Sequence, residues 1–361
     1  MKILYLSNST IPSYTANSIQ VMKMCEAFSK LGHEVTLISR YRNEYLIENI
    51  DNVHRYYGVS DNFNVKYLPR KIILIKTIIY QYNVLKKIKP DIVFGRDISV
   101  CIASILFGYS PIIEIHAPLN NKNKKLFKLL KHKIRKVIVI SDALKKIIVN
   151  QLPELAGKIL IAHDGVDLED FKLKKNKIKN KKFTVGYIGS LYKGRGVELI
   201  FNIAKQLPNL EFVLIGGNEE DVKLRKQQLD KCNLHNVTLL GFVNPGEVRK
   251  YYNQFDVLLM PYQKNTSIHQ NGVDTTKWMS PIKMFEYLAS GVPIISSNLP
   301  VLCEVLNNRN SILVHPEDLD EWIEAIKKIK NDLVLSKYLV DNALNDIKKY
   351  SWNERAKKIL E

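Results

Sequence analysis

The sequence has few cysteines, and they are widely separated. Its four cysteines, Cys25, Cys101, Cys232 and Cys303, form no C-x-x-C pair and have no cluster of metal-ligating residues around them. This spacing argues against a disulfide framework and against a cysteine-based zinc site. We therefore expect reduced thiols, most of them buried, and a cytoplasmic protein.

Long uninterrupted apolar runs are also missing. The longest, Ile98–Ala117, is interrupted by Pro111 and contains Glu114 and His116. A membrane-spanning helix needs about 20 predominantly apolar residues, so this stretch predicts a helix followed by a buried strand. The chain runs directly from its first two residues into the apolar Ile3–Leu6, so we expect no signal peptide. If the protein meets a membrane, we expect it to do so from the surface.

Acidic residues are scarce relative to basic ones. The 361 residues include 36 Asp and Glu against 54 Lys and Arg, which gives a formal net charge of +18. Such an excess favours an acidic partner, namely nucleic acid, an anionic membrane surface or a phosphorylated substrate. A Lys- and Ile-rich bias of the genome would produce the same excess without such a partner. The length indicates two domains, each with a sizeable core.

Short β-branched runs alternate with longer amphipathic stretches along the chain. The runs are apolar throughout rather than alternately apolar and polar, which is typical of parallel strands buried on both faces. Helices are predicted over Ser18–Leu31, before Gly32, and over Ile72–Ile88, before Lys89-Pro90. The predicted strands of the first half are Ile3–Leu6, Glu34–Ile38, Ile92–Phe94, Ile112–Ile115, Lys136–Ile140 and Ile159–Ala162.

A lysine-rich segment separates two similar halves of the chain. Residues 171–182 contain seven lysines and almost no core-forming residue, which predicts a solvated linker. We therefore predict an α/β protein of two doubly wound, Rossmann-like domains, residues 1–170 and 183–345, whose parallel sheets face a central cleft. Residues 346–361 are predicted to form a last helix. The predicted strands of the second domain are Thr184–Ile188, Glu211–Ile215, Val237–Leu240, Val257–Met260 and Pro293–Ser296.

The segment Ser280-Pro-Ile-Lys-Met-Phe-Glu286-Tyr-Leu-Ala-Ser-Gly291 has the strongest functional pattern. Ser280 and Pro281 fit a helix start, with Ser280 as the cap and Pro281 at the first helical position. The free backbone N–H groups of that turn would bind an anion such as a diphosphate. Glu286, nearly two turns later, is placed to accept two ribose hydroxyls, although a single Glu on a surface helix is more often structural. The Gly291-Val-Pro293 turn into a buried strand makes the pattern more specific.

This segment resembles the donor-binding signature of the family 4 retaining glycosyltransferases with the two-domain GT-B fold (glycosyl transferases group 1). The signature has the form E-x(7)-E, and its second Glu corresponds to Glu286. Trp278 occupies the first Glu position, so the sugar contact normally made there is expected from Asp274 or from the loop Asn271-Gly-Val-Asp274. The resemblance places Ile282 and Lys283 in the donor site, where Lys283 either supports the phosphates or lies on the solvent face.

A second pattern, Val185-Gly-Tyr-Ile-Gly189-Ser-Leu-Tyr-Lys193-Gly-Arg195-Gly196, is a strand that ends in a glycine-rich turn with two cations. Glycine lets the backbone approach a phosphate, and fixed cations offset its charge, but such turns are common in α/β proteins. Family 4 relatives carry an Arg and a Lys here that bind the donor diphosphate. Arg195 stands at the Lys position and Ser190 at the Arg position. The resemblance implies donor contacts by Arg195, Ser190 and Lys193, although solvation alone would also explain Lys193.

His116 follows a predicted buried strand, at the end of the sheet where ligands bind in this architecture. A single His is more often structural than catalytic, but family 4 relatives carry Glu-x-His here and their His contacts the transferred sugar. Glu114 is then expected to point into the fold and orient its surroundings. The loop Ser7–Ser18 matches a glycine-rich loop of the family, which places Ala16, Asn17 and Ser18 on the acceptor or sugar side. Ala16 and Asn17 replace the usual Gly pair.

Further implications of the resemblance concern the base and the division of labour between domains. The backbone near Phe242, in Leu240-Gly241-Phe242-Val, is expected to meet the nucleotide base. Residues 1–170 are expected to bind the acceptor and 183–345 the nucleotide sugar, with the helix 346–361 packed back on the first domain. Enzymes of this kind commonly build bacterial capsule, lipopolysaccharide or other surface glycans on lipid-linked carriers.

The resemblance also implies a mechanism. Family 4 enzymes retain the anomeric configuration and need no divalent metal, and no Asp-x-Asp metal motif stands at a strand end. We expect no metal and no cofactor, with a nucleotide sugar such as a UDP- or GDP-sugar as a substrate. Arg195 and helix N-termini would stabilise the departing diphosphate, while His116 polarises the sugar and the acceptor hydroxyl attacks from the same face.

A basic segment offers a use for the positive charge. Lys122–Lys136 holds eight Lys or Arg and no acidic residue. Its apolar residues Leu126, Phe127, Leu130 and Ile134 are spaced to share one helical face. This pattern fits a helix on an anionic membrane surface, where each cation adds about 1 kcal/mol. It fits equally well a surface helix that packs these residues into its own domain.

Two other function classes remain open. A nucleotide-sugar epimerase shares the architecture, but it needs several acid and base residues around the sugar, and the Ser-Pro-x-Lys-x-x-Glu segment argues against it. A basic nucleic-acid-binding protein is suggested by charge alone, without a recognition motif. A glycosidase gains little support because no pair of facing carboxylates is evident.

Overall fold

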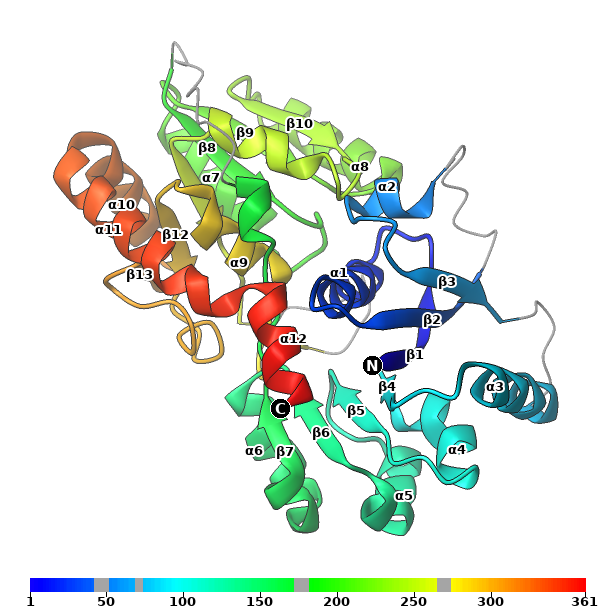
Figure 1. The fold of residues 1–361 in the computed structure, drawn as a ribbon. Coiled ribbons are helices and arrows are strands. Elements are labelled where there is room, and N and C mark those ends of the chain that lie inside the picture. The colour runs from blue at the N-terminus through cyan, green and yellow to red at the C-terminus, as the bar shows by residue number, and fades with distance from the viewer. Residues whose placement is uncertain (42–51, 69–73, 172–181, 265–273) are drawn as a thin grey trace. The chain divides into compact units, whose positions relative to one another are not determined.

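The structure is a computed structural model that describes residues 1–41, 52–68, 74–171, 182–264 and 274–361 (Figure 1). The chain forms two compact units: a first unit of Met1–Asp164 with Trp352–Glu361, and a second unit of Gly165–Ser351. Each unit is built on one parallel sheet with helices packed against it. The predicted fold class, two doubly wound Rossmann-like domains, is confirmed.

The sheet of the first unit has seven parallel strands in the order β3-β2-β1-β4-β5-β6-β7. The order reverses between β1 and β4, and ligands of doubly wound sheets bind beyond the carboxyl ends of the strands at such a point. The strands are β1 Lys2–Thr10, β2 Glu34–Arg40, β3 Asn64–Tyr67, β4 Ile92–Gly95, β5 Ile112–Ile115, β6 Lys136–Val139 and β7 Ile159–Ile161. The helices of this part are α1 Ala16–Lys30, α2 Val53–Tyr57, α3 Leu74–Ile88, α4 Ile98–Leu106, α5 Asn121–Leu130 and α6 Asp142–Gln151.

The sheet of the second unit has six parallel strands in the order β10-β9-β8-β11-β12-β13, which reverses between β8 and β11. All five residues of β8 and all four of β11 are buried, as expected for central strands covered on both faces. The strands are β8 Thr184–Ile188, β9 Glu211–Ile215, β10 Val237–Gly241, β11 Val257–Met260, β12 Ile294–Ser297 and β13 Ile312–Val314. The helices are α7 Val197–Gln206, α8 Glu219–Lys231, α9 Ile282–Ser290, α10 Leu319–Asn331 and α11 Leu333–Asp346.

Every predicted strand is present, most with small differences at the ends, but β1 extends to Thr10 instead of Leu6 and two strands were missed. β3 and β13 are edge strands of four and three residues. Runs this short, and in β3 half polar, are too brief to show a strand period. The stretch Ile98–Ala117 contains α4 followed by buried β5, as predicted. Two of the four cysteines, Cys25 and Cys101, are buried and the other two are exposed, so the expectation that most are buried was wrong.

The boundary between the units lies earlier than the predicted domain boundary. Apart from Phe171 and Lys182, the predicted linker 171–182 lies outside the described residues. The first unit ends at Asp164 instead of residue 170. Residues 165–171 belong to the second unit, where Val166 N–H donates to the Tyr350 carbonyl at 3.1 Å and Asp170 pairs with Arg249.

The predicted helix 346–361 is interrupted. α11 ends at Asp346, a short 3₁₀ helix follows, and Ser351 is extended with ψ of 151°. Ser351 leaves the helical region because it forms a parallel bridge with Val166. The last helix, α12 Trp352–Leu360, packs against α1 within the first unit.

Two features are absent from the residues that the structure describes. No helix there is long and apolar enough to cross a membrane. The same residues contain no group of three or more His, Cys, Asp or Glu side chains arranged to hold a metal ion.

Candidate functional site

The start of α9 differs by one residue from the prediction. Pro281 is the N-cap, with φ −75° and ψ 123°, and Ile282 is the first helical residue. The extended ψ of Pro281 keeps it outside the helix, so Ser280 is not the cap; its side chain is buried instead. Met284 N–H donates to the Pro281 carbonyl at 2.9 Å. The N–H groups of Ile282 and Lys283 therefore have no acceptor within α9 and are the ones suited to an anion.

Lys283 lies among aromatic rings and not on the solvent face. Its Nζ is 4.3 Å from the ring centre of Tyr187 and 4.6 Å from that of Tyr262. The guanidinium carbon of Arg195 lies 5.1 Å from the centre of the same Tyr262 ring. Burial, and then the charge of Arg195, holds the pKa of Lys283 well below its usual range, while Glu286 opposes this shift. Two cations thus share one ring at the start of α9, and an anion there would offset their repulsion.

Glycines allow the turn after β8 to approach these groups closely. Gly189 has φ of 152°, and a Cβ there would lie 3.1 Å from Lys283 Nζ. Gly196 has φ of 82°, and a Cβ there would lie 2.1 Å from the carbonyl oxygen of Pro261. Both conformations are ones that L side chains rarely adopt. The turn therefore packs directly on the end of β11, which brings Arg195 to Tyr262.

The other predicted residues of this turn have different environments. Lys193 is exposed to solvent. Ser190 is half-buried, and its carbonyl oxygen accepts a hydrogen bond of 2.7 Å from the Tyr187 hydroxyl. Arg195 is half-buried against Tyr262. Of the two cations of the turn, Arg195 is thus the one that the structure brings together with Lys283.

Glu286 is oriented by a buried tyrosine. Its Oε2 accepts a hydrogen bond of 3.0 Å from the hydroxyl of Tyr252, which is 2% exposed. One residue further on, the Tyr287 hydroxyl accepts from Ile188 N–H at 2.8 Å. This bond ties α9 to the carboxyl end of β8. Glu286 and the glycine-rich turn are therefore held in a fixed register.

Asp274 and Phe242 lie on separate loops of the second unit. Asp274 Oδ1 accepts hydrogen bonds from the backbone N–H and the hydroxyl of Thr276, at 3.0 and 2.7 Å, and so shapes the turn before Ser280. Trp278 in that turn is 9% exposed. Phe242 follows β10, two strands from β8 in the sheet, and 44% of it is exposed. Phe242 thus lies at the carboxyl edge of the sheet, where ligands of doubly wound sheets bind.

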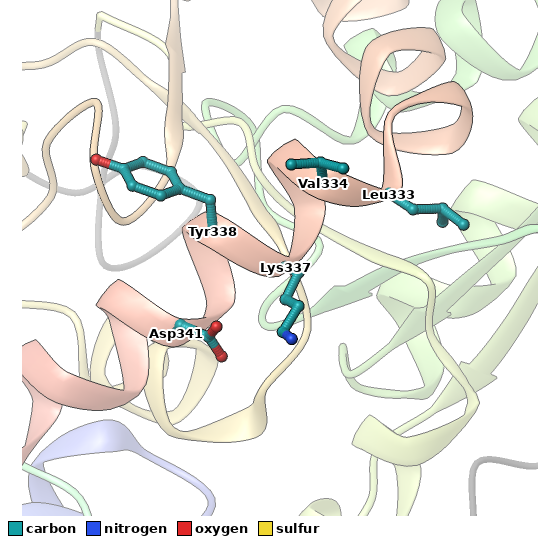
Figure 2. Close-up of a pocket in the computed structure, with 5 residues that line it drawn as sticks. All are labelled: Leu333, Val334, Lys337, Tyr338 and Asp341. Carbon is teal, nitrogen blue, oxygen red and sulfur yellow. The ribbon is translucent and has the colours of Figure 1, made fainter.

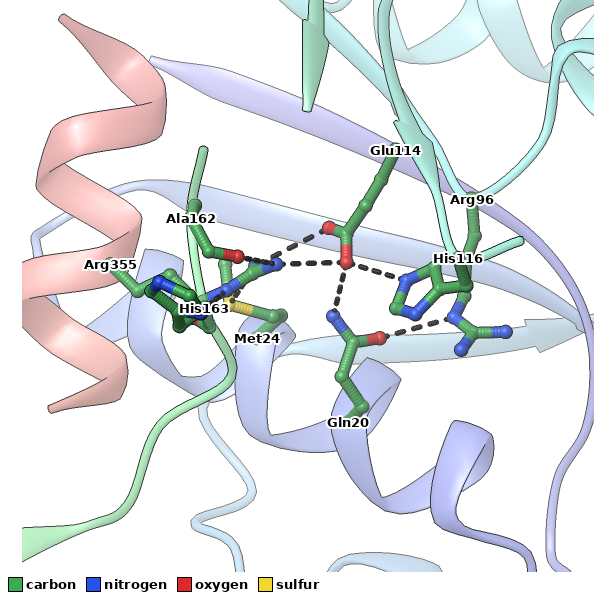
Figure 3. Close-up of polar contacts among 8 residues, drawn as sticks. All are labelled: Gln20, Met24, Arg96, Glu114, His116, Ala162, His163 and Arg355. Carbon is green, nitrogen blue, oxygen red and sulfur yellow. Dashed lines mark hydrogen bonds and ion pairs between the residues drawn. The ribbon is translucent and has the colours of Figure 1, made fainter. Parts of the chain in front are cut away.

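In the first unit, His116 follows β5 beside a buried carboxylate (Figure 3). His116 Nε2 lies 2.6 Å from Glu114 Oε1, and the Glu114 side chain is fully buried. Burial, followed by the charge of Arg96, lowers the pKa of His116 to about 4, although Glu114 opposes this shift. Glu114 points into the fold, as expected, and His116 is a neutral imidazole at neutral pH.

The predicted acceptor-side residues form the start of α1. The helix begins at Ala16, earlier than the predicted Ser18, because β1 extends to Thr10 and shortens the loop. Ser18 is fully buried, and its hydroxyl donates to the Thr15 carbonyl at 2.8 Å. The Asn17 side chain accepts from the Thr15 hydroxyl. Ser18 thus shapes the loop, whereas Ala16 is exposed and Asn17 half-buried.

The basic segment Lys122–Lys136 is not one amphipathic helix. α5 ends at Leu130, and residues 131–133 form a 3₁₀ turn before β6. Phe127 and Ile134 are each 1% exposed, so half of the predicted apolar face packs into the unit itself. Leu129, by contrast, is 77% exposed. The prediction of one continuous apolar face was wrong because the segment turns after Leu130.

A shallow pocket lies along α11 (Figure 2). Its lining residues are outside the sequence segments that contain the predicted site residues of the second unit. Its lining residues are all exposed, and they are Leu333, Val334, Lys337, Tyr338 and Asp341. The group contains a single Lys and a single Asp and no convergent set of polar groups. We assign no function to it.

Sequence reasoning did not single out several residues that complete these arrangements. Tyr187 and Tyr262 flank Lys283, Tyr252 orients Glu286, and Arg355 contacts Glu114. Tyr187 stands inside a segment that the resemblance had marked, so its position carried a signal, whereas Tyr262 lies two residues beyond the predicted strand Val257–Met260. Arg355 is 241 residues from Glu114 and had none.

Comparison with known proteins agrees with this architecture. The model of glycosyl transferases group 1 matches residues 169–346, and that of Glycosyltransferase Family 4 matches residues 18–170. A UDP-Gal:alpha-D-GlcNAc-diphosphoundecaprenol alpha-1,3-galactosyltransferase of Escherichia coli is 26% identical over 76% of each chain. An uncharacterized glycosyltransferase of Methanocaldococcus jannaschii is 25% identical over 62% of this chain and 58% of its own. With a capsular polysaccharide biosynthesis glycosyltransferase of Staphylococcus aureus, the chain spans about half of the relative's length, 52%.

Solved structures share the fold over nearly the whole chain. The Anabaena protein HepE in complex with UDP has a TM-score of 0.77 at 15% identity, covering 100% of this chain and 98% of that one. A glycosyltransferase from Rickettsia africae has a TM-score of 0.76 at 14% identity, covering 99% and 96%. Because the two family models together cover residues 18–346, the chain belongs to the family 4 glycosyltransferases, which have the GT-B fold.

Proposed function

We propose that this protein transfers a sugar from a nucleoside diphosphate sugar to a hydroxyl of a glycan or lipid-linked acceptor, with retention of configuration and without a metal or cofactor. The observation that carries the proposal is the pair of half-buried cations, Arg195 and Lys283, beside Tyr262 at the start of α9. Family membership supports glycosyl transfer over an epimerase or a nucleic-acid-binding protein.

The diphosphate is proposed to bind at this cation pair. A dianion would contact Arg195, Lys283 and the N–H groups at the start of α9, where positive charge and unsatisfied donors coincide. Family 4 relatives have an Arg at the position of Ser190, and Lys283 Nζ lies beside Gly189 in the same turn. Lys283 therefore supplies the second cation that Ser190 does not.

The nucleoside is proposed to lie along the same edge of the second unit. Glu286, held by Tyr252, is the acceptor for the ribose hydroxyls. The backbone near Phe242 meets the base, and Asp274 takes the sugar contact that Trp278 cannot make. The solved structure of HepE contains UDP, which supports a uridine nucleotide as the first donor to try.

The chemistry proposed is departure of the nucleoside diphosphate with attack of the acceptor hydroxyl on the same face. Arg195 and Lys283 stabilise the negative charge that grows on the departing phosphate. The acceptor proton passes to that phosphate. His116, as a neutral imidazole, hydrogen-bonds the transferred sugar and does not act as a nucleophile.

The acceptor side rests on relatives alone. The Escherichia coli relative is named for a diphosphoundecaprenol-linked acceptor, and another, from Salmonella typhimurium, is an O-antigen chain mannosyltransferase. We propose a role in bacterial surface polysaccharide synthesis and a place on the inner face of the cytoplasmic membrane. The lysines of α5 and the exposed Leu129 would meet that surface, and Ala16, Asn17 and Ser18 the acceptor.

Two experiments test the proposal: first the binding of the sugar donor, and then sugar transfer by variants. Thermal unfolding with UDP-, GDP- and ADP-sugars, in chelator, should show stabilisation by one of them, followed by slow nucleotide release. Arg195→Ala should lower turnover by roughly 10²-fold or more, whereas Lys193→Ala, in the same turn but exposed, should not. Stabilisation by nucleic acid alone, or undiminished transfer by folded Arg195→Ala, would overturn the proposal.

A further inference from the structure

A buried polar network connects the C-terminal helix with His116 (Figure 3). Glu114 Oε1 accepts hydrogen bonds from Gln20 Nε2 at 2.7 Å and from Arg355 Nη2 at 2.9 Å, beside His116 Nε2 at 2.6 Å. Glu114 Oε2 accepts from Arg355 Nη1 at 3.3 Å. Arg355, which lies on α12, therefore donates hydrogen bonds to both carboxylate oxygens of Glu114.

Arg355 is itself fixed by the backbone. Its Nε donates to the His163 carbonyl at 2.8 Å and its Nη2 to the Ala162 carbonyl at 3.2 Å. The side chain is 2% exposed. A planar guanidinium with acceptors on several sides has one orientation, so the carboxylate that it binds also has one.

An ionised carboxylate only accepts hydrogen bonds, so the imidazole nitrogen beside it carries the hydrogen. Nε2 of His116 is then N–H, and Nδ1 keeps its lone pair. We propose that Arg355 is a positioning residue: by holding Glu114 as an oriented carboxylate, it fixes His116 as the Nε2–H tautomer, whose Nδ1 accepts a hydroxyl of the transferred sugar. The sugar in this statement rests on the proposed function, whereas the tautomer does not.

The neighbouring charges explain why Arg355 determines the ionisation state of Glu114. Burial disfavours ionisation of Glu114, but Arg355 and His116 outweigh it and hold the pKa of Glu114 well below its usual range. Among the described residues, the titratable groups that also act on this pair include Tyr5 on β1, Arg96 after β4 and Asp164 after β7. Of the two arginines, Arg96 contacts Gln20 and Arg355 contacts the carboxylate.

Removal of Arg355 leaves Glu114 buried with two neutral donors. Burial then favours the protonated acid, and its O–H can donate to Nε2 of His116. The imidazole hydrogen moves to Nδ1, and the acceptor for the sugar is lost. Glu114→Gln should have the same effect, because the amide oxygen turns to Arg355 and the amide N–H₂ faces His116.

The test is the tautomer of His116 in full-length protein with ¹⁵N-labelled histidine, with the resonance assigned by His116→Gln. The native protein should show the Nε2–H form, and Arg355→Met and Glu114→Gln should lose it. Lys358→Met, on the exposed side of α12, is the matched control and should keep it. If Arg355→Met does not fold, Glu114→Gln and the more conservative Arg355→Lys, which should retain the Nε2–H form, decide the question. An unchanged tautomer in a folded Arg355→Met or Glu114→Gln variant overturns the inference.

Kinetics separate this role from simple stabilisation. With a donor that is turned over, Arg355→Met should lower kcat by roughly 10²-fold and leave the KM of the donor nearly unchanged, because the diphosphate contacts are intact. An unchanged kcat would contradict the role in transfer. A protein that transfers no sugar but shows the predicted tautomers would refute the proposed function and leave the positioning by Arg355 standing.

Discussion

The two units hold their candidate site residues in opposite ways. In the first unit the buried charge of Glu114 is matched within the unit by Arg355, and Gln20 completes its hydrogen bonds. In the second unit Arg195 and Lys283 are brought beside one ring, and the pKa of Lys283 is held well below its usual range by burial and by Arg195. A balanced network has its geometry before a ligand arrives, whereas a pair of like charges gains most of its stabilisation from the ligand.

The largest expected effect is the loss of stability when the buried ion pair between Arg355 and Glu114 is removed. Arg355→Ala leaves a buried carboxylate without its cation, which costs about 3–5 kcal/mol when one partner of a buried pair is removed. Urea denaturation should show this loss. Arg249→Ala removes the partly exposed pair with Asp170 in the second unit, and should cost about 0–1 kcal/mol. Equal losses would mean that burial does not distinguish the two pairs.

Lys283→Met should separate stability from binding in the second unit. Without the desolvated cation the free protein should be as stable as before or more so, since Met fills the space between Tyr187 and Tyr262 at no charge cost. The affinity for the nucleoside diphosphate should fall by about 10- to 100-fold, as expected for a lost charge-assisted hydrogen bond. Calorimetric titration and thermal unfolding measure both. A variant destabilised without ligand would show that Lys283 is structural.

Donor binding should also take up a proton at Lys283. Its pKa in the free protein lies below that of an ordinary lysine, so a bound diphosphate, which favours the charged form, raises it. As the pH rises through the depressed pKa, native affinity should fall. In that range the binding enthalpy should depend on the ionisation enthalpy of the buffer, and in Lys283→Met it should not. A binding enthalpy of the native protein that is independent of the buffer at every pH at which the protein is folded would argue against this coupling.

The smallest expected effect is the decline in the stability of the first unit as the pH falls. Burial first of all lowers the pKa of His116 to about 4, and that of His163 to about 4 as well. Both groups bind fewer protons when folded than when unfolded, so stability should decline as the pH falls from about 6.5 towards 4. His116→Gln should reduce this slope by roughly one proton. A slope identical to that of the native protein would mean that His116 ionises freely in the folded state.

Local sequence was enough for most of the fold and for part of the site. Continuous apolar runs predicted β8 and β11 because central parallel strands are buried on both faces, and Arg195 and Glu286 stood in recognisable segments. The cap of α9 was misplaced because proline tolerates both the cap and the first helical position, and only ψ distinguishes them. The two edge strands were too short to leave a pattern.

Contacts between residues that are far apart in the sequence could not be predicted from local sequence patterns. The solvent-face alternative for Lys283 failed because its aromatic neighbours come from other strands and turns. Phe127 and Ile134 could be assigned to a membrane face or to the core, and only packing decided for the core. The partner of Glu114 lies on α12, and nothing in the local pattern of either segment announces the other.

The return of α12 to the first unit also bears on synthesis. Glu114 and Arg355 are 241 residues apart, so at ribosomal rates the carboxylate exists for on the order of 10 to 50 s before its cation is made. During that interval the sheet of the first unit can form, but its central acid has no countercharge and favours the protonated state. His116 can therefore be fixed as the Nε2–H tautomer only after the second unit has been translated. The first unit is completed when α12, which follows the second unit in the chain, packs on it.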